Sequence, residues 1–168
     1  TSGPAYVPAR ITTPVVMSNE NIELVVSPRE GGIVSLRDRV TGMELVPEGE
    51  VLGAILRQQE APHGMTAWTL GAITETVTPL AGATIEATAR GPHLAAVRLT
   101  GKHGQSDYAL TISLAAGSSR VAFELDVNWL ERGDSTTGVP ALGAEFPLAI
   151  TDGRANFEIP CGSIERPA

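Results

Sequence analysis

The feature that most constrains the fold is a pair of segments, 108–114 and 121–129, in which large apolar side chains occupy every second position. Successive side chains of a β-strand point to opposite faces, so each apolar row lies on one face of a strand. Burying such side chains contributes about 1.5–3 kcal/mol each, which outweighs local preferences for other structure. Because Ala116-Gly117-Ser118-Ser119 separates the segments, they predict an antiparallel strand pair with one face in the core. The rows are Tyr108, Leu110, Ile112 and Leu114, then Val121, Phe123, Leu125, Val127 and Trp129.

Shorter alternating segments recur along the chain and predict further strands. They cover residues 22–27 and 33–38, 85–90 and 95–100, and 144–150 and 155–159. Residues 51–59 are ambiguous, because their apolar residues have helical spacing but Gly53 and the short length disfavour a stable helix. The chain has 18 Gly and 12 Pro, which interrupt helices and suit strands joined by tight turns. The fold class predicted is all-β, an antiparallel β-sandwich.

We expect an extended lead-in over residues 1–17, rich in Pro and small residues, followed by one sandwich domain over residues 18–168. The chain stops just after a predicted strand without a shift in composition. We therefore expect the sandwich to be truncated at its C-terminal end, with an open sheet edge that lets the isolated chain self-associate.

The charge balance excludes several classes of partner. With 12 Lys+Arg against 19 Asp+Glu the net charge is −7, and no basic cluster occurs, so we expect neither nucleic acid nor a membrane as partner. Cys161 is the only cysteine, which rules out an intramolecular disulfide and a multi-cysteine metal site. The sequence has neither a signal-peptide pattern nor an Asn-x-Ser/Thr sequon, and we expect a cytoplasmic location.

Five residues are candidate carbohydrate contacts: Trp68, His63, Glu124, Asp126 and Asn128. A Trp ring offers an apolar platform for the C–H face of a sugar. The sequence fits a core position and a surface position of Trp68 about equally well. Glu124, Asp126 and Asn128 share the polar face of one predicted strand, where residues i and i+2 lie roughly 6.6–6.8 Å apart. That spacing falls in the roughly 6.5–9.5 Å range of inverting glycosidase carboxylates, but any solvated acidic strand produces it, and a solvated face is the interpretation we favour.

No catalytic residue or metal site is predicted within the chain. Metal sites need converging ligands, whereas His63, His93 and His103 lie singly beside Gly in predicted turns, where exposed histidines are the simpler interpretation. Trp129 continues a core row, and we expect it to be buried. Glu131, Arg132, Glu165 and Arg166 are expected to be structural, as salt-bridged charges at strand ends.

Three stretches together resemble the C-terminal region of the α-mannosidases of glycoside hydrolase family 38. The first runs from Asn19 to Leu45 and is similar to the strand and hairpin that open that family's β-sandwich. The second, His63-Gly64-Met65-Thr66-Ala67-Trp68, resembles its Ala-Trp segment. The third combines Asn128-Trp129-Leu130-Glu131-Arg132 with the Phe-Pro of 146–147 and the Gly162 to Pro167 stretch, and looks like the family's Trp-x-Glu, Phe-Pro and Gly-x-x-x-Arg-Pro motifs.

The resemblance implies a fold and a role. The fold is part of a galactose-mutarotase-like supersandwich. The parent enzyme is implied to be a retaining, zinc-dependent hydrolase of α-mannosides, whose zinc ligands and catalytic aspartates belong to an N-terminal domain that this chain does not contain. The segment itself is then non-catalytic and inactive alone, packs on its own N-terminal catalytic domain, and closes one side of the sugar pocket. Residues 133–140 depart from the basic, leucine-rich stretch usual in the family.

Two other functions are also compatible with the sequence. One is a stand-alone carbohydrate-binding module that uses Trp68 and the Glu124, Asp126 and Asn128 face. The other is an epimerase or lyase on a related supersandwich, which would need a His or carboxylate in a concave face.

Overall fold

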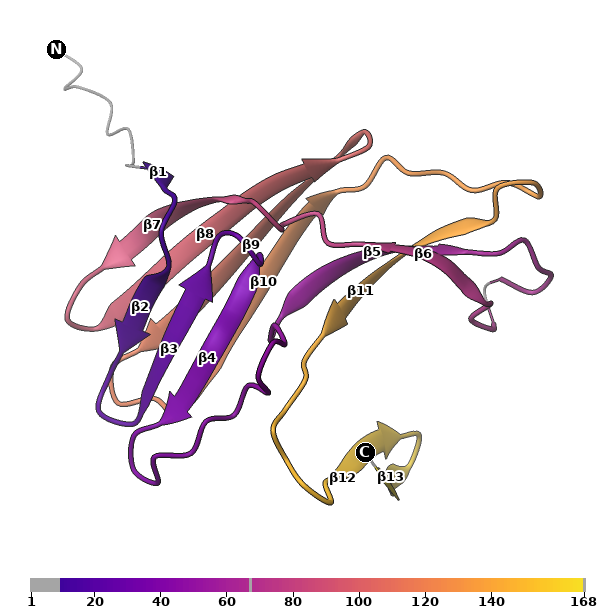
Figure 1. Ribbon diagram of the computed structural model, residues 1–168. Coiled ribbons are helices and arrows are strands. Elements are labelled where there is room, and N and C mark those ends of the chain that lie inside the picture. Colours follow the sequence, from indigo (N-terminus) through magenta and orange to yellow (C-terminus); the bar gives the residue numbers. More distant parts are fainter. Residues whose placement is uncertain (1–9, 67, 168) are drawn as a thin grey trace, which may run out of the picture.

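The fold is built from strands alone over the part of the chain that the computed structural model describes, residues 10–66 and 68–167. Thirteen strands form three antiparallel sheets and one separate hairpin (Figure 1). The predicted all-β class is confirmed. None of the described residues forms a helix long and apolar enough to cross a membrane.

The large sheet has five strands in the order β1-β7-β8-β9-β10. Its long members β8 and β9 pair over ten residues each, and β9 pairs with all eight residues of β10, so the strand pair predicted from the alternating rows is present. In this pair Leu110 lies opposite Leu125 and Ile112 opposite Phe123. The bounds are β1 Arg10–Ile11, β7 Thr84–Arg90, β8 Leu94–His103, β9 Ser106–Ala115 and β10 Val121–Asn128.

The small sheet, β2-β3-β4, lies in front of the large sheet in Figure 1 and completes the sandwich. Its strands are β2 Val15–Ser18, β3 Ile22–Ser27 and β4 Gly32–Asp38. Strand β1 and all but the last residue of β2 lie within the expected lead-in, so the sheets incorporate the chain from Arg10 onward. The rest of the expected lead-in, residues 1–9, lies outside the described residues.

The core fills the space between these two sheets. One cluster joins side chains of β3 and β4 with side chains of β7, β8 and β9, and its central members are fully buried. Alternation therefore places one face of each strand in the core, as expected for a sandwich. The most buried members are Leu24, Val26, Ile33, Leu80, Ile85, Val97, Leu99, Leu110 and Ile112.

The side sheet and the C-terminal hairpin extend from the sandwich (Figure 1). The side sheet has the order β11-β5-β6, with β5 Ala54–Glu60, β6 Ile73–Val77 and β11 Val139–Glu145, so the ambiguous stretch 51–59 is a strand over most of its length. The hairpin pairs β12 Arg154–Ile159 with β13 Gly162–Pro167. Every residue of β13 is exposed, and the two strands of the hairpin contact mainly each other.

Candidate functional site

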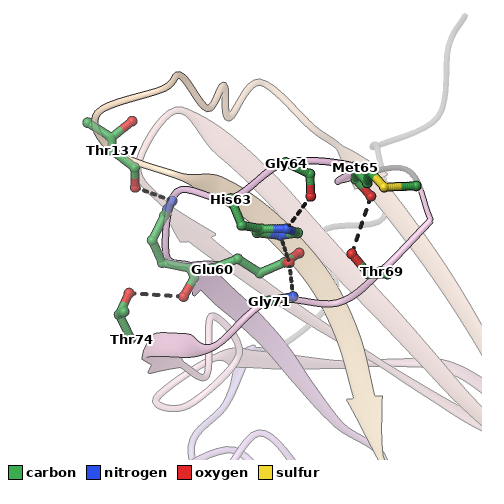
Figure 2. A network of polar contacts seen from close by, with 9 residues as sticks. Glu60, His63, Gly64, Met65, Thr69, Gly71, Thr74 and Thr137 are labelled. Carbon is green, nitrogen blue, oxygen red and sulfur yellow. Dashed lines mark hydrogen bonds and ion pairs between the residues drawn. The ribbon is translucent and has the colours of Figure 1, made fainter.

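Two of the sequence candidates, His63 and Trp68, lie on one loop between β5 and β6, which we call the Trp68 loop (residues 61–72). Figure 2 shows the polar contacts of His63 in this loop. The loop closes at its base where the Ala61 amide donates to the Ala72 carbonyl over 2.8 Å. A second closure comes from Thr74, whose hydroxyl donates to the Gln59 carbonyl over 3.0 Å. Ala67 of the Ala-Trp segment lies outside the described residues.

Glu60, the last residue of β5, organises the loop from inside. Its side chain is only 6% exposed, and its Oε2 accepts from the Gly71 amide at 2.6 Å and from His63 Nε2 at 2.9 Å. A Cβ added to Gly71 would lie 2.5 Å from the His63 ring, so a larger residue at this position would displace the imidazole. Glu60 thus connects both halves of the loop to the end of the strand.

The partners of His63 decide its protonation state. Its Nδ1 lies 2.7 Å from the Gly64 carbonyl oxygen and its Nε2 lies 2.9 Å from the Glu60 carboxylate, and both partners are acceptors. Both contacts are hydrogen bonds only when each ring nitrogen carries a proton. Glu60, followed by the Gly64 carbonyl, accordingly raises the pKa of His63 above its usual 6.5. The Gly71 amide and then His63 lower the pKa of Glu60 below its usual 4.5.

His63 is therefore not the simple exposed turn histidine that its sequence context indicates. Its side chain is 21% exposed and bound on both ring nitrogens, whereas His93 is exposed at the β7–β8 turn. Glu60 was not predicted as a candidate because nothing in its local sequence distinguishes it from a solvated strand-end carboxylate. Its role depends on the conformation of the Trp68 loop, which places the Gly71 amide beside its carboxylate.

The outer side of the Trp68 loop is apolar. Trp68 is 83% exposed, with Met65 at 70% and Leu70 at 72% beside it in sequence. A turn supports this tip, because the amides of Trp68 and Thr69 both donate to the Met65 carbonyl. Two polar side chains of the loop are used internally, since the Thr69 hydroxyl also bonds to the Met65 carbonyl and His63 has no free nitrogen. The tip therefore offers an apolar contact surface with few free hydrogen-bonding side chains.

A hollow of about 280 Å³ separates the Trp68 loop from the loop that follows β10. Its walls include His63 and Thr66 on one side and Asp134 and Ser135 on the other. Asp134 caps its own loop by accepting from the amides of Thr137 and Thr136, which lowers the pKa of its carboxyl. These residues belong to the 133–140 stretch that departs from the family pattern.

The other three carbohydrate candidates lie elsewhere. Glu124, Asp126 and Asn128 are exposed on the outer face of β10, and Asp126 pairs with Arg98 over 3.2 Å. No hydrogen bond, ion pair or common hollow among the described residues joins them to His63 or Trp68. The sequence candidates thus form two separate groups and not one site.

The structural candidates near the end of β10 surround a second hollow, of about 680 Å³. Trp129 is half-buried and packs edge-on against Tyr108, with ring centroids 6.5 Å apart. Glu131 is held by hydrogen bonds and not by the expected ion pair: its Oε1 accepts from the buried Ser106 hydroxyl at 3.0 Å and from the Gln105 amide at 3.2 Å. These two donors, Ser106 first, keep the pKa of Glu131 below its usual range. Arg132 lines the same hollow.

Glu165 and Arg166 lie on the exposed hairpin. Glu165 pairs with Arg154 over 2.7 Å, as expected of a strand-end charge, and the Arg166 guanidinium lies 5.9 Å from the centroid of the Phe157 ring. Both contacts join β12 to β13 and leave the outer faces of the hairpin free.

The donor set does not fit a zinc ion. No group of three or more His, Cys, Asp or Glu side chains gathers anywhere in residues 10–66 and 68–167, and both nitrogens of His63 already have partners. A structural or catalytic zinc needs at least three protein ligands. No step of a zinc-dependent reaction can be assigned to these residues.

Comparison with known proteins identifies one family. The family model described as the glycosyl hydrolases family 38 C-terminal domain matches residues 17–168. A search of curated proteins finds no match to the chain. The matched residues include both sheets of the sandwich except β1 and the first two residues of β2, together with the Trp68 loop and the C-terminal hairpin.

Proposed function

The chain belongs to the family of glycosyl hydrolase family 38 C-terminal domains, and we propose that it serves as the non-catalytic β-sandwich of an α-mannosidase-type glycoside hydrolase. The parent enzyme is proposed to hydrolyse α-mannosides with retention and with zinc, using residues of an N-terminal catalytic domain. This segment packs on that domain. The family match is the observation that carries the proposal.

The uncovered apolar surface supports the packing role. Monomeric soluble proteins rarely expose large contiguous apolar patches unless they form an interface. Over residues 146–164 six large apolar side chains are between 37% and 57% exposed. A two-stranded hairpin is also marginal on its own, so β12 and β13 need a surface to pack on. The six residues are Phe146, Leu148, Ile150, Phe157, Ile159 and Ile164.

The Trp68 loop is the segment that we propose to close one side of the sugar pocket. Its tip is apolar and exposed, and its base is fixed by Glu60, so the loop can keep its shape while Trp68 contacts another surface. A fixed conformation lowers the entropy cost of binding.

Hydrolysis is the first test. The purified chain, supplied with zinc and p-nitrophenyl α-mannoside, is expected to release no p-nitrophenol above the buffer rate. Release that survives chelation and dialysis would place catalysis within the segment and contradict the proposal. We also expect the reading frame that encodes the chain to carry an upstream region with His and Asp zinc ligands, and an upstream region without them would contradict the proposed parent activity.

A stand-alone carbohydrate-binding module is the second candidate, because the 83% exposure of Trp68 would suit a sugar platform. Sugar sites also need polar groups beside the ring, and two polar side chains of the Trp68 loop, His63 and Thr69, are already engaged internally. Titration with methyl α-mannoside is therefore expected to give no binding by the wild type or by Trp68→Ala. Binding that Trp68→Ala abolishes would favour the module.

The epimerase or lyase function has no comparable support. His63 and His93 lie in turns between different strand pairs, and no hydrogen bond or common hollow among the described residues connects them.

A further inference from the structure

Strand β10 ends the large sheet with an open edge. Its eight residues all pair with β9 on one side, and no strand adjoins its other side in the sheet order. Within the described residues, no backbone hydrogen bond from outside the sheet reaches residues 121–128. An exposed edge of this length offers a row of free N–H and C=O groups that can pair with another extended chain.

The inner face of β10 is only partly covered. Leu110 of β9 and Leu125 of β10 are direct cross-strand partners on the same face, yet Leu110 is 1% exposed and Leu125 is 38% exposed. Coverage resumes at Phe123, which stacks edge-on against Phe146 with centroids 5.3 Å apart. A strand added beside β10 would cover Leu125 with its own inward-facing side chains and extend the apolar core.

The outer face of β10 is acidic. Glu124 and Asp126 both lie on it, and Asp126 remains 73% exposed although it pairs with Arg98. Glu124 forms no ion pair with any described residue. Because cross-strand neighbours on one face interact directly, an added strand gains most when it places Lys or Arg opposite these two carboxylates.

The same charges disfavour a second copy of β10 as the occupant. In the antiparallel register centred on Leu125, which pairs most of the strand with itself, Glu124 of each copy lies opposite Asp126 of the other. Like charges directly opposite one another destabilise a strand pair. Pairing between the β10 edges of two copies is therefore disfavoured.

We propose that the open edge of β10 is a strand-addition site for a partner polypeptide with an extended segment that alternates apolar side chains, facing the core, with Lys or Arg, facing outward. The backbone ladder supplies affinity, the uncovered area at Leu125 accepts the apolar side chains, and Glu124 and Asp126 select basic partners. This is strand addition to an existing sheet.

Two synthetic peptides test the charge selection. One alternates valine with lysine over the eight-residue length of β10, and its counterpart alternates valine with glutamate. At low ionic strength the lysine peptide is expected to bind the wild-type chain about tenfold more tightly, because two attractive cross-strand pairs replace two repulsive ones. Hydrogen exchange is expected to slow at the outward amides of β10 when this peptide is added.

Matched double variants separate the edge from general electrostatic attraction. Glu124→Lys/Asp126→Lys is expected to reverse the peptide preference, and Glu124→Gln/Asp126→Gln to abolish it. The control, Glu48→Lys/Glu50→Lys, changes two exposed acidic residues at the same spacing by the same total charge in a loop away from β10, and is expected to keep the preference.

Three results would overturn the proposal. Equal effects of the two lysine double variants would mean that the peptide responds only to net charge. Slowed exchange confined to another strand would place the peptide elsewhere. A wild-type dimer with β10 amides protected before any peptide is added would assign the edge to a second copy.

Discussion

At the scale of single residues, the Glu60–His63 pair is the clearest product of tertiary structure. Glu60 is a charged side chain that burial alone would make unfavourable, and it is tolerated because a backbone amide and an imidazolium both donate to it. The pair also links the protonation state of the molecule to the conformation of the Trp68 loop. Its stabilising effect must therefore depend on pH.

The sign of that dependence follows from the two pKa shifts. The pKa of His63 is raised, so its contribution is complete below 6.5 and is lost as pH rises through the folded-state pKa. The pKa of Glu60 is lowered, so its contribution is present above 4.5 and is lost as pH falls through the folded-state pKa. The stabilising contribution of the pair is expected to be greatest between pH 4.5 and pH 6.5, the ordinary pKa values of Glu and His.

An NMR titration of the His63 imidazole should give an inflection above 6.5 that moves back toward 6.5 in Glu60→Gln. An unchanged inflection would exclude the contact.

Ser106 gives a second prediction at this scale. Its hydroxyl is fully buried, accepts from the Leu130 amide at 2.9 Å and donates to Glu131. Ser106→Ala leaves that amide and that carboxylate short of a partner, so the free energy of unfolding is expected to fall by about 1–3 kcal/mol. Urea unfolding measures it. Ser113→Ala in the same strand, where no side-chain hydrogen bond forms, is expected to change it by less than about 0.5 kcal/mol.

At the scale of elements, burial across the large sheet decreases from β9 to its edge. Leu110 and Leu125 show this decrease, because they are the same residue type, are direct cross-strand partners on one face, and differ in burial. Leu110→Ala is expected to lower the free energy of unfolding by about 2–5 kcal/mol, because it leaves a cavity in a closed core. Leu125→Ala removes a side chain that already meets solvent, and a markedly smaller loss is expected. Equal losses in urea unfolding would mean that β10 is covered in solution.

The turn between β3 and β4 shows how one element constrains another. Gly31 has a φ of +78°, and a Cβ added there would clash with the backbone of Leu80, which lies in the β6–β7 connection. Gly49 has a similar φ of +83° but open space around it. Gly49→Ala is expected to cost only the conformational strain of about 1–2 kcal/mol, and Gly31→Ala clearly more. Thermal unfolding of both variants compares them, and equal costs would deny the close approach.

At the scale of the whole molecule, stability is distributed unevenly. Strands β8 and β9 share the central core, whereas β12 and β13 contact mainly each other and expose nearly all of their side chains. Amide hydrogen exchange is expected to be slowest in β8 and β9 and fastest, among the strands, in β12 and β13. Exchange in the hairpin as slow as in β9 would show that a second copy or another surface covers it.

Much of this architecture follows from the sequence, because alternation with a period of two is a local property. The rows 108–114 and 121–129 predict both the strands β9 and β10 and the face of each that meets the core. The ordered motifs around Trp129 and Gly162 similarly carry enough information to identify the family. Alternation says which face is apolar, but it does not say which strands are covered. The exposure of Leu125 and of the C-terminal hairpin is therefore seen only in three dimensions.

The site required the tertiary structure for the same reason. The sequence alone determined the all-β class, most of the strand positions, the acidic charge and the family. The predicted strand 144–150 was wrong, because the chain is irregular over residues 146–150 and the strand there, β11, covers Val139–Glu145. It grouped His63 and Trp68 with Glu124, Asp126 and Asn128 by residue chemistry, and the folded chain separates them onto a loop and a sheet face. Only the fold decided that Glu60 is buried, that His63 is doubly bound and that β10 is open. Each of these depends on which segments distant in sequence pack together, such as Gly71 against Glu60 and Phe146 against Phe123. No local sequence pattern encodes that packing.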